Sequence, residues 1–208
     1  MARKATRDAR RRALRWRRLR AVLAGGVVLG IGAAATLAAW NDTEHTTATL
    51  TAGTFGIVGA TNGTTFTEHA SAGAAAVLNF QVAPTAMTPG TTTYALFSVR
   101  TVNPSVAGSV LLTATDSNAT TGLGQYLTYG VRTVPAAQCD ATTFGASTAT
   151  VILSGSPLGA DAASSQSLSA NGASTVNYCF AVTLPSTAPN AAQGASVTPT
   201  WQFTATSS

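Results

Sequence analysis

TVNYCFAVTL, residues 175–184, is the stretch that decides the fold class. Every second residue from Val176 to Leu184 is apolar, so an extended backbone would present one continuous apolar row. An amphipathic helix would need apolar residues three or four positions apart instead. The stretch therefore predicts a β-strand that buries one face in a core.

The same alternation recurs in residues 94–100 and 125–134, and turn-forming Gly, Pro, Asn and Asp separate the other β-branched and aromatic runs. No segment after Trp40 has a helical period, so we expect no helix there. Strands with one apolar face need a second layer to cover that face. This predicts an all-β fold, a two-sheet antiparallel β-sandwich, preceded by an N-terminal signal or transmembrane helix. The expected strands are Thr47–Val58, Ala75–Val82, Thr92–Val102, Gly108–Thr115, Gln125–Val134, Thr148–Leu153, Thr175–Leu184 and Val197–Thr206.

Proline and small residues predict where the sheet has an edge and where the chain forms a loop. Pro199 lies inside the last expected strand and has no N–H for a ladder, which predicts an edge strand or a bulge there. Residues 154–174 are rich in Ser, Ala and Gly, and we expect them to form a long surface loop.

The charge of the chain is concentrated at its N-terminus. Ten of the twelve Lys and Arg residues lie in Met1–Arg20, whereas residues 39–208 carry two arginines against six acidic residues. The overall net charge of +5 therefore belongs to the leader and not to the domain. A domain with a net negative charge has no basic footprint, so nucleic-acid binding is rejected.

A basic block followed by an apolar run is typical of an export signal. Residues 21–39 carry no charge, and small side chains in Thr36-Leu37-Ala38 predict cleavage between Ala38 and Ala39. We therefore divide the chain into a signal peptide, 1–38, with a basic n-region 1–20 and an apolar h-region 21–38, and a secreted domain, 39–208. Two alternatives stay open, an uncleaved membrane anchor through residues 21–39 and a twin-arginine signal.

The border of leader and domain resembles a known family. GIGAAATLAAWND, residues 30–42, and TAGTFGI, residues 51–57, are similar to the SipW-cognate signal class of the TasA/camelysin family, and the likeness covers about residues 25–58. The resemblance implies cleavage by a SipW-like signal peptidase, a jelly-roll sandwich, and cell-surface or biofilm-matrix fibres. The long arginine-rich n-region departs from the family pattern. With eleven arginines against one lysine and abundant alanine, the chain resembles an actinobacterial relative.

Cys139 and Cys179 are the only cysteines, and both follow the export signal. An even number of cysteines in an oxidising compartment favours a disulfide, with two free thiols as the alternative. Closing a loop of about 40 residues stabilises a fold by roughly 3–4 kcal/mol in the chain-entropy treatment.

No catalytic residue or cofactor is expected. A zinc protease of the H-E-x-x-H type needs two histidines one helical turn apart, whereas this chain has only Glu44-His45 and Glu68-His69. These four residues are weak candidates for a metal site. The turn Asp116-Ser117-Asn118 could offer oxygen ligands to calcium, or it could be an ordinary β-turn.

Together these features predict a secreted, surface-associated structural protein without catalytic activity. We expect residues 47–58 to complete their own sheet or to pair with the next subunit, which would allow self-assembly. The alternatives are a monomeric or membrane-anchored surface adhesion module and a camelysin-like secreted metalloprotease. The expected localisation is extracellular or at the cell surface.

Overall fold

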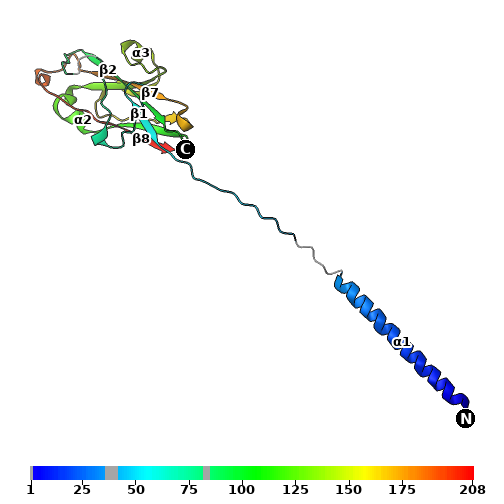
Figure 1. Cartoon of the computed structure of the whole chain (residues 1–208). Coiled ribbons are helices and arrows are strands. Elements are labelled where there is room, and N and C mark those ends of the chain that lie inside the picture. Colours follow the sequence, from blue (N-terminus) through cyan, green and yellow to red (C-terminus); the bar gives the residue numbers. More distant parts are fainter. Residues whose placement is uncertain (1, 36–41, 82–84) are drawn as a thin grey trace. The chain divides into compact units, whose positions relative to one another are not determined.

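The computed structural model describes residues 2–35, 42–81 and 85–208 (Figure 1). The chain divides into two units, Met1–Leu50 and Thr51–Ser208. In the first unit, helix α1 spans Ala2–Ala35, and its residues 13–29 are exposed. Within the described part of the chain, no helix has an apolar stretch long enough to cross a membrane. The predicted cleavage site between Ala38 and Ala39 lies outside the described residues.

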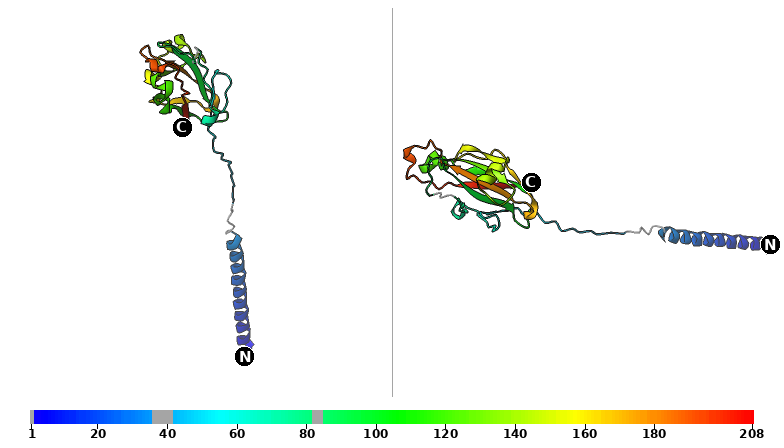
Figure 2. Two further views of the ribbon diagram at one scale, coloured as in Figure 1. Left: turned by 90° about the vertical axis from the view of Figure 1, so that its left-hand side faces the viewer. Right: turned by 90° about the horizontal axis from the view of Figure 1, so that it is seen from above.

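The second unit is built mainly from two antiparallel sheets, whose arrangement can be followed in Figure 2. One sheet has five strands in the order β1-β2-β7-β4-β5, and the other has three in the order β6-β3-β8. The first sheet contains β1 (Ile57–Ala60), β2 (Thr92–Thr101), β7 (Val176–Thr183), β4 (Thr128–Val134) and β5 (Thr150–Pro157). The second contains β6 (Gln166–Leu168), β3 (Gly108–Ala114) and β8 (Trp201–Ser207). The short helices are α2 (Ser117–Thr120), α3 (Ala141–Ala146), η1 (Ala72–Ala74), η2 (Gly122–Tyr126), η3 (Ala170–Gly172) and η4 (Asn190–Ala192).

Strand β7 lies in the middle of the five-stranded sheet, and its apolar face is buried in the core, as its alternating sequence predicts. It pairs with β2 on one side and with β4 on the other. Tyr178 and Phe180 point toward the second sheet, where the ring of Phe203 lies 4.9 Å from Tyr178 and 6.5 Å from Phe180 between ring centroids. The apolar row of 175–184 thus packs β7 against β8, which confirms the two-layer expectation. The five row residues, all in contact with the main core, are Val176, Tyr178, Phe180, Val182 and Leu184.

The opposite face of the five-stranded sheet carries a smaller core around the predicted disulfide. Cys139 is bonded to Cys179, with their Cα atoms 5.1 Å apart. Both cysteines are buried and pack with Phe144 of α3. The bond joins β7 to the segment before α3, so the two-cysteine prediction is confirmed.

Two of the expected strands are wrong. Of the expected strand Thr47–Val58, only residues 57 and 58 lie in a strand, and β1 continues to Ala60. Residues 75–81 form no strand, and residue 82 lies outside the described residues. Both segments have strand-like sequences, but a strand also needs a neighbouring edge with which its N–H and C=O groups can pair.

The predictions for loops and helices also need correction. The expected loop 154–174 contains the end of β5 and the whole of β6, and Leu158 and Leu168 within it are fully buried. The expectation of no helix after Trp40 is wrong for α2 and α3, although each is too short to show a helical period. The last strand is at an edge, as predicted, and Pro199 lies just before it rather than inside it.

Candidate functional site

The segment that leads into the domain is exposed through Thr54 and half-buried from Phe55 onward. Residues 42–50 are all exposed, and Leu50 is 93% exposed. Residues 54–56 are instead held by the 102–106 segment: the Val106 N–H donates to the Thr54 carbonyl at 2.9 Å, and the Val102 N–H donates to the Gly56 carbonyl at 3.0 Å. The region expected as one strand therefore consists of an exposed half and a docked half.

Three of the four sheet edges are protected against pairing with another chain. β1 has four residues and β6 has three, which leaves little backbone to pair. β5 is longer, but its register with β4 shifts twice, Gly155 has φ of 88°, and Pro157 ends the strand. Bulges and proline disrupt the regular spacing that an added strand requires.

The β8 edge has none of these protections. Its seven residues pair in unbroken register with β3 and include no charge, Pro or Gly. Its other edge has no ladder partner among the described strands. A regular, uncharged edge of this length is a ready template for another strand. The candidate assembly surface is therefore the β8 edge of the second unit.

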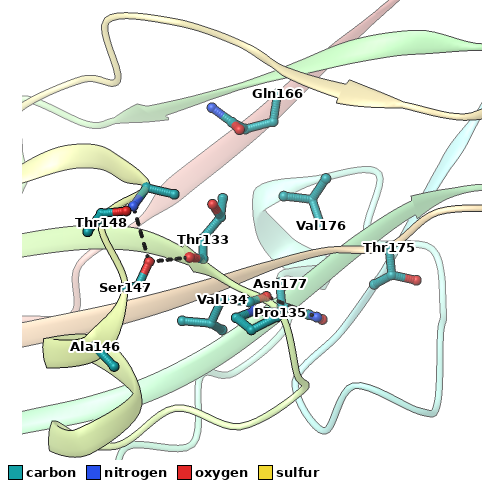
Figure 3. A pocket seen from close by; sticks show the side chains of 11 residues that line it. Thr133, Val134, Pro135, Ala146, Ser147, Thr148, Gln166, Thr175, Val176 and Asn177 are labelled. Atoms are coloured by element: carbon teal, nitrogen blue, oxygen red, sulfur yellow. Dashed lines mark hydrogen bonds between the residues drawn. The ribbon is translucent and has the colours of Figure 1, made fainter.

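A shallow hollow of about 500 Å³ lies where β4 ends and β7 begins. Figure 3 shows Gln166 of β6 on one side of it and Thr133 and Ser147 on the other. None of its lining residues is charged. The lining residues are Thr133, Val134, Pro135, Ala146, Ser147, Thr148, Ala149, Gln166, Thr175, Val176 and Asn177.

The wall of the hollow is held by Arg132 and by the cap of α3. The Arg132 guanidinium donates to the carbonyls of Phe144 at 2.8 Å and Ser147 at 2.7 Å, and it lies 4.6 Å from the centre of the Phe144 ring. The Asp140 carboxylate accepts from the Thr143 N–H, and this bond, with a second from the Gln138 side chain, lowers the pKa of Asp140. The Nη1 of Arg132 is thus engaged within the protein, whereas its buried Nε has no hydrogen-bond partner among the described residues.

The floor of the hollow contains a buried polar pair. Ser98 is fully buried and donates to the Asn177 side-chain oxygen at 2.7 Å, while the Asn177 amide reaches the Val134 carbonyl at 3.4 Å. The Gln166 amide has no hydrogen bond to another described residue. With uncharged hydroxyl and amide groups on its surface, the hollow suits a small neutral polar ligand.

The predicted metal candidates do not form a metal site among the described residues. Glu44 and His45 lie in the exposed segment 42–50, Glu68 is exposed, and the His69 ring shares a hydrogen bond of 3.1 Å with the Thr67 hydroxyl. No three His, Cys, Asp or Glu side chains in the described ranges are grouped closely enough to hold a metal ion.

The turn considered for calcium has another role. The Asn118 side chain donates to the Thr200 carbonyl at 2.7 Å and accepts from the Thr200 N–H at 2.9 Å. Asn118 is buried and fixes the segment that enters β8, so its oxygen is already used. Sequence inspection missed this clamp because its partner is 82 residues away.

The sequence predicted the edge position of the last strand, but the lack of protection at this edge and the hollow were missed. The absence of charge and Gly from residues 201–207 was a usable signal for the edge, whereas the hollow depends on segments that meet only in the folded chain. No protein-family model matches the chain, and no curated protein matches it significantly.

Proposed function

We propose that this chain is a secreted, surface-associated structural protein whose domains assemble through β-strand addition. A SipW-like signal peptidase would release it, and its domain would be a jelly-roll of the TasA/camelysin type. The buried disulfide supports this proposal, because such bonds persist in oxidising compartments outside the cytoplasm.

The proposal rests on two features, an exposed segment that could form a strand and a sheet edge that could accept one. Residues 42–50 are exposed, and residues 46–50, Thr-Thr-Ala-Thr-Leu, suit a strand. β8 offers a regular edge without a partner in the described sheets. Addition of residues 46–50 of one copy to β8 of the next would be a heterologous contact, and repetition of such a contact produces filaments.

The experiment compares chains that begin at Ala39 and at Thr51 by sedimentation velocity over a wide concentration range. We expect the longer chain to form oligomers and the shorter chain to remain monomeric. Leu50→Lys should reduce assembly at least tenfold, because it replaces the large apolar side chain of the added strand with a charge. Thr49→Lys replaces a polar side chain on the opposite face and should have a smaller effect. A longer chain that stays monomeric under all conditions contradicts the proposal.

The hollow favours a second candidate, a monomeric surface module that binds a neutral polar ligand. The supporting observation is the uncharged lining together with the Gln166 amide, which has no partner in the described part of the chain. NMR titration of the domain with neutral disaccharides tests it. Shifts confined to the lining residues would favour binding, and no shift at millimolar ligand would reject it.

A further inference from the structure

Residues 75–81, which we call the strap, have the side-chain pattern of a strand without its hydrogen bonds. Ala76, Leu78 and Phe80 are half-buried and pack against the main core, whereas the residues between them are exposed, with Val77 at 79%. In a paired strand, this alternation would be accompanied by a ladder of backbone bonds.

The strap has few polar contacts. Its one backbone bond to β2 among the described residues runs from the Gln81 N–H to the Tyr94 carbonyl, at 3.0 Å. The Asn79 side chain reaches the Thr61 hydroxyl at 3.5 Å, the upper limit for a hydrogen bond. By contrast, β2 pairs with β7 over eight consecutive residue pairs. The strap is therefore held mainly by three apolar side chains.

The strap lies beside a part of β2 that no described strand covers. β1 pairs with β2 only from Ser98 to Thr101, and among the described residues no other strand pairs with the earlier residues of this edge. The contact of Gln81 with Tyr94 places the strap along that remaining edge. The strap thus occupies the position of an edge strand without being one.

The course of β8 explains why the core needs this cover. At its start, the Trp201 ring lies 6.0 Å from Tyr129 of β4, and two residues later the Phe203 ring lies 4.8 Å from Phe97 of β2. β8 therefore crosses the five-stranded sheet obliquely, from β4 toward β2. Leu78 and Phe80 of the strap pack against the same core, and Gln81 of the strap bonds to Tyr94 in the first half of β2.

We infer that the strap opens without unfolding of the domain and that its opening uncovers the β2 edge and the adjoining core for an extended segment of a second copy. The opening follows from the contacts of the strap alone. The role of the strap in controlling assembly rests on the proposed function. Opening of the strap would expose the β2 edge as a second edge for strand pairing, on the side of the five-stranded sheet toward which β8 crosses.

Hydrogen exchange measured by NMR on the full chain tests the opening at Gln81, the strap amide that is hydrogen-bonded to β2. We expect the Gln81 amide to exchange at least 100-fold faster than the bonded amides of β7. Exchange as slow as that of β7 would overturn the inference, and the unmodified chain is sufficient for this result.

A matched pair of substitutions tests the control of assembly. Phe80→Ala should accelerate exchange in the strap and at residues 94–97 about tenfold, leave β7 unchanged, and increase the oligomeric fraction in sedimentation. Val77→Ala, on the exposed side of the strap, should change none of these. Faster exchange throughout the domain in Phe80→Ala would overturn the inference, because the strap would then be part of the cooperative core. A strap that opens in a chain that never assembles would contradict the proposed function instead.

Discussion

The hydroxyl of Tyr178 is buried with no hydrogen-bond partner among the described residues. An unpaired buried hydroxyl costs free energy, so Tyr178→Phe should leave the free energy of unfolding unchanged or raise it by up to about 1 kcal/mol. Tyr129 provides the control, since its hydroxyl donates to the Ala160 carbonyl. Tyr129→Phe should lower the free energy of unfolding by about 1 kcal/mol, measured by denaturant titration.

The same substitution has a pH dependence. Burial raises the pKa of Tyr178 well above its usual value near 10. Above pH 10 the unfolded chain then loses the phenol proton while the folded chain keeps it, so the stability contribution of the neutral phenol declines as the pH rises. Tyr178→Phe should weaken this alkaline loss of stability. An alkaline unfolding curve identical to that of the unmodified chain would contradict the assignment.

The contacts of a single residue could be predicted where the sequence showed what kind of partner the residue needs. Cys139 had one possible partner, and the apolar residues of 175–184 needed a core. Arg132 and Asn118 were not predictable, because each bonds backbone carbonyls that the fold alone brings near. Local composition does not reveal such contacts.

At the scale of the element, β8 offers a direct measure of packing between the sheets. Phe203 lies against Phe97 and Tyr178, so Phe203→Ala should lower the free energy of unfolding by roughly 2–3 kcal/mol through lost burial and a new cavity. Thr204 faces the solvent, and Thr204→Ala should change it by less than about 0.5 kcal/mol. Thermal or chemical denaturation of both variants measures the difference, and equal losses would contradict this packing.

The strands that alternation predicted correctly are those with partners on one or both sides, such as β2 and β7. Residues 47–56 and 75–81 have equally suitable sequences, but the described fold gives them no ladder. Strand propensity is a property of the segment, whereas pairing is a property of the neighbours it finds. The difference is largest at the edges, where the candidate assembly surface and the strap lie.

At the scale of the whole domain, the Cys139–Cys179 bond closes a loop with a sequence separation of 40. Replacing both cysteines with alanine should lower the free energy of unfolding by roughly 3–4 kcal/mol in the chain-entropy treatment. Because both cysteines are buried, reductant should act slowly on the folded domain and quickly after denaturant is added. Thiol labelling measures the reduction of the disulfide. Rapid reduction under native conditions would contradict this expectation.

The two-layer architecture could be predicted from the sequence, because one-sided strands must be covered. The sheet order could not, since many orders bury the same residues. The hollow could not be predicted either, because its wall combines the end of β4 and the start of β7 with one residue of β6.

The two arginines of the domain are both stacked on aromatic rings. Arg100, in β2, lies 4.0 Å from the centre of the Phe66 ring, as Arg132, in β4, lies over Phe144. From Thr51 onward the chain has no lysine, so these are the only sites at which a trypsin-like protease could cut. Both peptide bonds lie within paired strands, which a protease cannot accommodate without local unfolding. Digestion should therefore cut within residues 1–20, where the other Lys and Arg residues lie, and spare the folded domain.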